Sequence, residues 1–79
     1  MKIKVLGPGC VNCQRLETNV KAAVEALGLE ADIEKVSDFQ EILKYGVMST
    51  PGLVVEEKVI SVGRVPTKED IQKMLQAIR

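Results

Sequence analysis

Histidine and tryptophan are absent from this sequence of 79 residues, and its aromatic side chains are one tyrosine and one phenylalanine. Without histidine, Cys–His nucleophilic catalysis, histidine proton relays and mixed Cys/His zinc sites are excluded within this chain. With so few aromatic rings, the chain has nothing on which nucleic-acid bases would stack. Lys and Arg number 11, as do Asp and Glu, so no net charge attracts nucleic acid or an anionic membrane. We therefore expect neither nucleic acid nor a membrane among the partners.

Long apolar runs are also missing. The first ten residues, MKIKVLGPGC, lack the apolar core of a signal peptide, and no window approaches the length of a transmembrane helix. We therefore expect a cytoplasmic monomer in which residues 1–79 form a single domain. Structural disulfides are uncommon in the reducing cytosol, so the two cysteines of the chain need another explanation.

The hydrophobic pattern alternates between the two-residue period of strands and the 3.6-residue period of helices. Strands are predicted at 2–6, at 31–36 and twice within 52–63, and helices at 13–27, at 38–45 and after the capping box that begins at Thr67. The order β-α-β-α-β-β-α contains a βαβ unit, whose right-handed crossover makes its two strands parallel, and a later antiparallel hairpin. This pattern predicts an α/β fold in which a mixed four-stranded sheet is flanked by three helices that cover both of its faces.

The short second helix has clear boundaries in the sequence SDFQEILKYG. Ser37 or Asp38 is suited to cap its N-terminus, and a glycine follows its last turn. Its apolar side is expected to present Phe39, Ile42 and Leu43.

Charged residues suggest two further local features. On the first helix Glu17, Lys21 and Glu25 follow one another at spacings of four, which predicts a solvated ladder of charges. In the hairpin, Glu56 and Glu57 stand where a tight turn favours Asn-Gly, so a longer or bulged turn is expected.

Cys10 and Cys13 lie two residues apart, between the first strand and the first helix. Unpaired N–H groups and the helix dipole stabilise an anion at a helix start, so Cys10 is expected to be a reactive thiolate. Cys13 continues the apolar stripe of Leu16 and Val20, so its sulfur should be the more buried of the two. We therefore expect Cys10 to be the attacking nucleophile and Cys13 to be the resolving thiol that closes the disulfide.

Three other interpretations of the cysteine pair compete with this one. A purely structural disulfide would close so short a loop that it would stabilise the fold by only about 2 kcal/mol. A four-cysteine zinc site would need the cysteines of a second chain. A copper(I) carrier or binding module is the main alternative, because two soft thiolates select that metal. Small copper carriers, however, usually have Met where this chain has Pro8, and their order, β-α-β-β-α-β, ends on a strand.

The segments GPGCVNC, YGVMSTPGLVV and VGRVPTKEDI together resemble the small thioredoxin-like and glutaredoxin-like redox-active disulfide proteins of archaea and bacteria, in the thioredoxin superfamily. The resemblance covers nearly the whole chain. It implies a thioredoxin-like fold and a protein dithiol–disulfide oxidoreductase that uses the Cys10–Cys13 couple and needs no cofactor or metal. It also implies that Pro51 is cis and that the backbone of Thr50 holds the substrate by β-augmentation. The implied partners are disulfide-containing proteins and an electron donor similar to thioredoxin reductase.

The sequence departs from the thioredoxin pattern in the residues around the cysteines. Thioredoxins carry a buried acid beneath the cysteines that helps to deprotonate the resolving thiol. The first strand offers only Lys2 and Lys4 in that region, so the sequence does not identify the group that takes the proton of Cys13.

Overall fold

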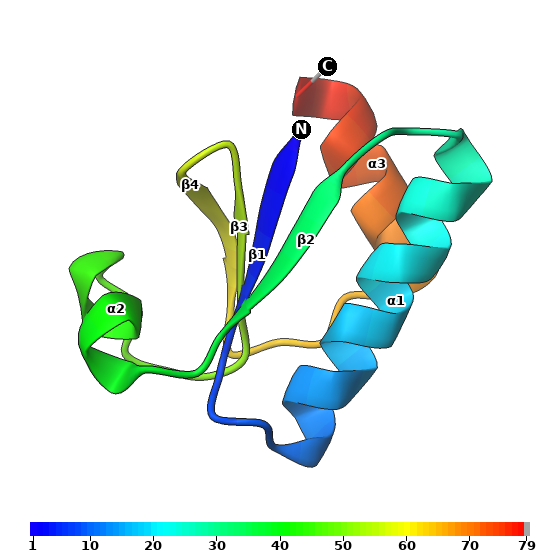
Figure 1. The fold of residues 1–79 in the computed structure, drawn as a ribbon. Coiled ribbons are helices and arrows are strands. Elements are labelled where there is room, and N and C mark those ends of the chain that lie inside the picture. The colour runs from blue at the N-terminus through cyan, green and yellow to red at the C-terminus, as the bar shows by residue number, and fades with distance from the viewer. Residues whose placement is uncertain (79) are drawn as a thin grey trace.

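The computed structural model describes residues 1–78 and confirms the predicted element order (Figure 1). The strands are β1 (Lys2–Leu6), β2 (Asp32–Val36), β3 (Gly52–Val55) and β4 (Lys58–Val62), and the helices are α1 (Val11–Leu27), α2 (Phe39–Lys44) and α3 (Lys68–Ile78). Among the described residues, no helix combines the length and the apolar character needed to cross a membrane.

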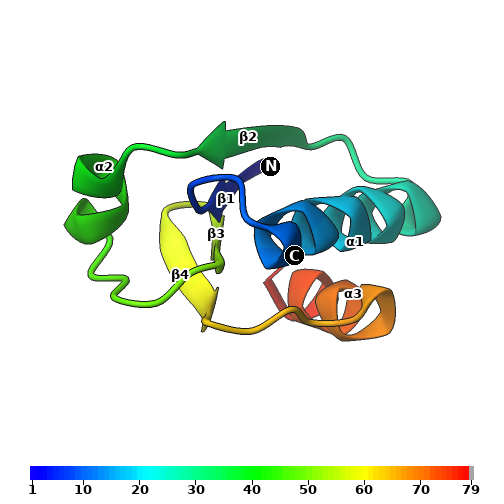
Figure 2. The ribbon, with the colours of Figure 1, turned by 90° about the horizontal axis from the view of Figure 1, so that it is seen from below.

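The four strands form one mixed sheet in the order β2-β1-β3-β4. The central strand β1 is parallel to β2 and antiparallel to β3, and β3 is antiparallel to β4. Figure 2 shows α1 and α3 side by side on one face of the sheet and α2 alone on the other. The predicted α/β class, with helices on both faces, is therefore confirmed.

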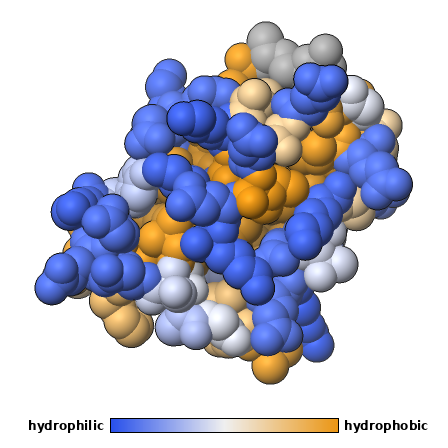
Figure 3. Space-filling model, viewed as in Figure 1, coloured by the Kyte–Doolittle hydropathy of each residue, from blue (hydrophilic) through white to orange (hydrophobic). Residues whose placement is uncertain are grey.

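The two faces of the sheet have cores of unequal size. The larger core lies between the sheet and the α1–α3 pair, and it includes Ile3 and Val5 of β1 with Leu16, Ile71 and Leu75 of the helices. This core reaches the surface along the boundary between β2 and α1, where Figure 3 shows a hydrophobic strip. The smaller core, under α2, consists of Leu6, Ile42, Val47 and Val54.

The short helix α2 is capped as predicted but buries less than predicted. Asp38 is its N-cap, and its Oδ1 accepts a hydrogen bond of 2.9 Å from the N–H of Gln40. Of the three apolar residues expected to face the core, only Ile42 is buried, whereas Phe39 and Leu43 are 60% and 56% exposed. The prediction was wrong for these two because a helix of six residues turns only one side chain of this set onto the small core.

The β3–β4 hairpin closes with a two-residue turn, so the expectation of a longer or bulged turn is wrong. Glu56 and Glu57 both have positive φ, at 52° and 67°, a backbone region that glycine or asparagine usually supplies. Their side chains are anchored, because Glu56 accepts from the N–H of Lys2 at 3.0 Å and Glu57 accepts from Tyr45 at 3.1 Å. The bulge lies instead within the strands, where the register shifts between Leu53 and Val54.

Lys4 connects this turn to the end of α2. Its ammonium group donates to Tyr45 Oη at 2.6 Å and lies 3.3 Å from a carboxylate oxygen of Glu57. These two hydrogen bonds raise the pKa of Lys4 to about 12. Lys4 therefore keeps its charge at neutral pH and links the hairpin turn to the end of α2.

Candidate active site

The two cysteines form a disulfide at the start of α1. Cys10 is the N-cap residue, with extended backbone, and its Sγ accepts from the N–H of Cys13 at 3.2 Å. The first turn of α1 carries no acidic residue that would offset the positive end of the helix dipole. Negative charge that develops on the Cys10 sulfur is therefore stabilised at this position.

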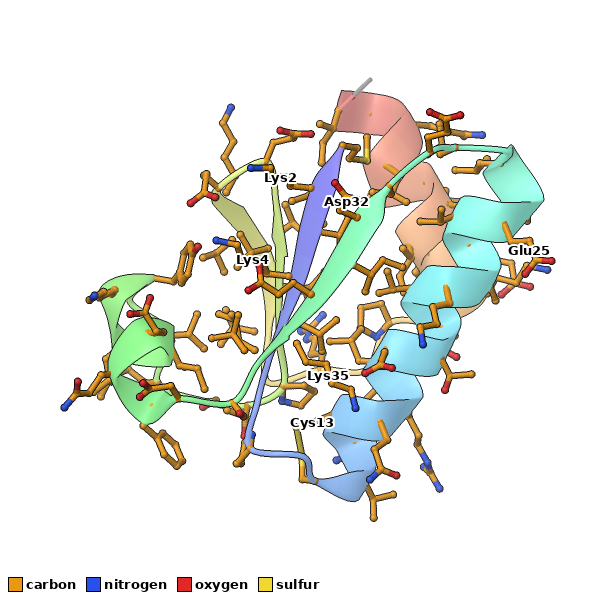
Figure 4. The ribbon with its side chains drawn as sticks, viewed as in Figure 1. Lys2, Lys4, Cys13, Glu25, Asp32 and Lys35 are labelled. Atoms are coloured by element: carbon orange, nitrogen blue, oxygen red, sulfur yellow. A yellow bond between two sulfur atoms is a disulfide. The ribbon has the colours of Figure 1, made fainter. Side chains whose placement is uncertain are left out.

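The two sulfurs differ in accessibility, as the sequence predicted. Cys13 is 5% exposed and its side chain lies between α1 and the end of β1 (Figure 4). Cys10, in contrast, is exposed. A partner molecule can therefore reach the sulfur of Cys10 more easily than that of Cys13.

Gly7 permits the close approach of β1 to the disulfide. A Cβ atom at this position would overlap the Sγ of Cys13 and would lie 3.8 Å from the Cβ of Thr50. The N–H of Gly7 donates to Val36 O at 2.8 Å, which holds the segment against the end of β2. Only glycine fits between the disulfide and the Thr50 loop.

The loop of Thr50 and Pro51 lies beside the disulfide, and the peptide bond between these two residues is cis, as the resemblance implied. A third loop supports it, because the N–H of Gly63 donates to Pro51 O at 2.8 Å. Thr50 is partly exposed and Pro51 is buried. The structure thus brings together the four predicted site residues, Cys10, Cys13, Thr50 and Pro51, from distant parts of the sequence.

Each of the two loops of the site carries an exposed apolar side chain close in sequence to the site residues. Val11, directly after Cys10, is 66% exposed, and Met48, two residues before Thr50, is 85% exposed. Val47, in contrast, belongs to the small core. Val11 and Met48 therefore offer apolar contact surface to a molecule bound at the site.

Glu17 is an acid close to the cysteines, although its spacing from Lys21 and Glu25 predicted a place in a solvated ladder of charges. It lies one helical turn after Cys13, a spacing that places Cβ atoms about 5–6 Å apart. Its side chain is only 16% exposed, and it pairs with Lys21 at 3.0 Å and with Lys35 of β2 at 3.2 Å. Its Oε2 atom is buried and lies 3.2 Å from the ammonium nitrogen of Lys35. The four-residue spacing between Cys13 and Glu17 was the sequence signal that could have identified Glu17 as an acid beside the cysteines.

The hydrogen bond from Lys21 lowers the pKa of Glu17, with a further contribution from Lys35, although partial burial opposes the shift. A carboxylate whose pKa is lowered in the folded state stabilises the protein above its usual pKa of 4.5. That stabilisation is lost as the pH falls through the lowered value. Glu17 is therefore expected to contribute to the acid sensitivity of the fold.

The variant Glu17→Gln should accordingly lose less unfolding free energy than the wild type as the pH falls below 4.5. Because the pair with Lys21 is partly exposed, the difference should stay within about 1 kcal/mol. Urea unfolding at several pH values measures it. Glu25→Gln, on the same helix, is the matched control and should follow the wild-type curve. Parallel curves for the wild type and Glu17→Gln would contradict the prediction.

Comparison with known proteins assigns the family. The model of the thioredoxin domain family matches residues 1–76. Over 75 residues the chain is 45% identical to a thioredoxin of Methanothermobacter thermautotrophicus, an alignment that covers 95% of this chain and 97% of the relative. It is 39% identical over 75 residues to a thioredoxin of Methanocaldococcus jannaschii, covering 95% and 86% of the two chains. This chain therefore belongs to the thioredoxin domain family, and with its Cys10–Cys13 disulfide it is a thiol–disulfide oxidoreductase.

Proposed function

We propose that this protein reduces disulfides of partner proteins, with Cys10 as the nucleophile and Cys13 as the resolving thiol. The observation that carries these roles is the contrast between the exposed Cys10 at the N-cap of α1 and the buried Cys13 one turn inside the helix. The exposed sulfur meets the substrate, and the buried sulfur meets only its neighbour.

The reaction runs in two exchanges. In the reduced protein the Cys10 thiolate attacks one sulfur of the substrate disulfide, forms a mixed disulfide and releases the other sulfur as a thiolate. Cys13 then loses its proton and attacks the Sγ of Cys10, which releases the second substrate thiolate. Both released thiolates take up protons. Two electrons have passed to the substrate, and the Cys10–Cys13 disulfide has formed.

Thr50 and Pro51 are proposed to hold the substrate during these exchanges. The Thr50 backbone would pair with an extended substrate segment, as in other cases of strand addition. Pro51 has no N–H to donate, and its carbonyl is engaged by Gly63. Pro51 would therefore keep the loop in place while Thr50 binds.

The proposed partners are disulfide-containing proteins and an electron donor similar to thioredoxin reductase, which returns the Cys10–Cys13 pair to the dithiol. We place this cycle in the cytoplasm, where a reductant is present to recharge it, and we propose that the protein works as a monomer with a single domain. The alternative of a copper(I) carrier is disfavoured by the observed order, in which α2 precedes β3 and a helix comes last.

Turnover on a model disulfide tests the proposal. The full chain, with dithiothreitol as the reductant, is expected to accelerate reduction of an uncharged peptide disulfide above the rate with dithiothreitol alone. The Cys10→Ala variant should lose this acceleration entirely, because no accessible sulfur remains to attack. A wild-type rate no higher than the background rate would refute the proposed function.

A further inference from the structure

The loops around the disulfide carry charge of one sign only. Segments 7–15, 45–52 and 61–67 contain two cations, Arg15 and Arg64, and no aspartate or glutamate. This distribution is notable because acidic and basic residues are equal in number in the chain as a whole. The site is therefore positively charged within a protein that has no net charge.

Carboxylates next to these loops are already engaged. Glu17, two residues after Arg15, pairs with Lys21 and Lys35. Asp70 lies in the same surface depression as Arg64, but its carboxylate belongs to the capping box of α3, in which Oδ2 accepts from the N–H of Thr67 at 3.4 Å. Among the described residues, neither acid forms an ion pair with an arginine of the site.

The two arginines differ in their partners from four of the eight lysines. Lys4, Lys21, Lys35 and Lys44 each pair with a carboxylate of this chain. Within residues 1–78, neither Arg15 nor Arg64 forms such an ion pair. A guanidinium group is the side chain best suited to hold a carboxylate, because it can donate two parallel hydrogen bonds to it. Both arginines are therefore available to a carboxylate that comes from another molecule.

Surface shape places both arginines within reach of one bound segment. Arg15 lines a shallow depression with Val11 and Val65, and Arg64 lines a neighbouring depression that Val65 shares. Val11 directly follows the exposed Cys10, and Gly63, just before Arg64, contacts the Pro51 loop. A chain that crosses Cys10 thus meets apolar surface at Val11 and the two cations of the depressions that Val65 joins.

We propose that the partner of this site is an acidic protein segment, in which carboxylates flank the disulfide to be reduced and bind Arg15 and Arg64. Apolar side chains of the same segment pack on Val11 and Met48. This inference rests on the proposed reduction of protein disulfides and specifies which disulfides are preferred.

Three synthetic peptides of equal length test it. Each contains the same internal disulfide, flanked by aspartate and glutamate, by serine and asparagine, or by lysine. At low ionic strength the full chain, recharged by dithiothreitol, is expected to reduce the acidic peptide at least about tenfold faster than the basic one. Added sodium chloride should shrink this ratio, because salt screens exposed charges.

Reversing the charges of the two arginines tests whether they cause the preference for the acidic peptide. The double variant Arg15→Glu/Arg64→Glu should reverse the order of the acidic and basic peptides. Lys58→Glu/Lys73→Glu changes the net charge equally, at exposed positions outside the three loops, and should keep the wild-type order. Equal rates for all three peptides, or equal effects of the two double variants, would overturn this inference alone. Failure to reduce even the uncharged peptide would overturn the proposed function and this inference with it.

Discussion

Replacing Cys13 with serine should stall the protein as a mixed disulfide with its substrate. Cys10 keeps its place at the N-cap of α1 and still attacks, but no neighbouring sulfur remains to displace the bound substrate. Incubation of reduced Cys13→Ser with an excess of peptide disulfide should convert most of the protein to a species heavier by one peptide chain. Mass spectrometry without reductant detects this species, and dithiothreitol should reverse it.

The reciprocal variant controls for the chemistry of a lone cysteine. Cys10→Ser leaves only Cys13, which is 5% exposed in the wild type and lacks access to the partner. It should form the mixed disulfide at least about tenfold more slowly, since thiol–disulfide exchange requires access to the sulfur. Equal trapping by the two variants would show that the assigned roles of Cys10 and Cys13 are wrong.

Substituting Gly7 with alanine should damage both the fold and the reaction. The added Cβ would overlap Cys13 Sγ, and neither side has room to yield. Gly7 is held by its hydrogen bond to Val36, while Cys13 is buried and linked to Cys10. Overpacking of this kind costs about 1–3 kcal/mol of unfolding free energy. The displaced sulfur should also slow peptide reduction by roughly tenfold to a hundredfold, because exchange depends on the alignment of three sulfurs.

The variant Gly28→Ala separates the effect on stability from the effect on the rate of peptide reduction. Gly28 ends α1 with φ at 65° and has open space around it, so alanine there is strained without touching the site. It should lose about 1–2 kcal/mol of unfolding free energy and keep the wild-type rate at temperatures where the protein is folded. Urea unfolding and peptide reduction measure the two quantities. If Gly7→Ala and Gly28→Ala reduced peptide at the same rate, the steric explanation would be wrong.

The order and type of the elements could be predicted from the sequence because each element has a clear period and a clear end. Gly28 marks the end of α1 as a left-handed C-cap, and Asp38 caps α2 through its side chain. The failures occurred where tertiary contacts outweigh local preference. Glu56 and Glu57 adopt positive φ because distant groups on β1 and Tyr45 hold their carboxylates, and no local pattern encodes those groups.

The site was predictable to the extent that its chemistry is local. Cys10 and Cys13 lie within one helical turn, so their order and unequal burial follow from the position of the helix start. The proximity of Thr50 and Pro51 to the sulfurs came only from the resemblance, since nothing in the intervening residues specifies how the sheet brings them together. Glu17 was misassigned because its burial depends on Lys35, which reaches it from a different strand.

The unequal cores have a mechanical consequence for the site. The cysteines stand on α1, a helix of 17 residues that buries five side chains, whereas the loop of Thr50 follows α2, a helix of six residues that buries one. Local stability follows the amount of buried apolar contact. The cysteine side of the site is therefore expected to be the more rigid, and the Thr50 side the more easily deformed. In the proposed function, this difference would keep the reacting sulfurs aligned while the Thr50 loop adjusts to substrate segments of different shape.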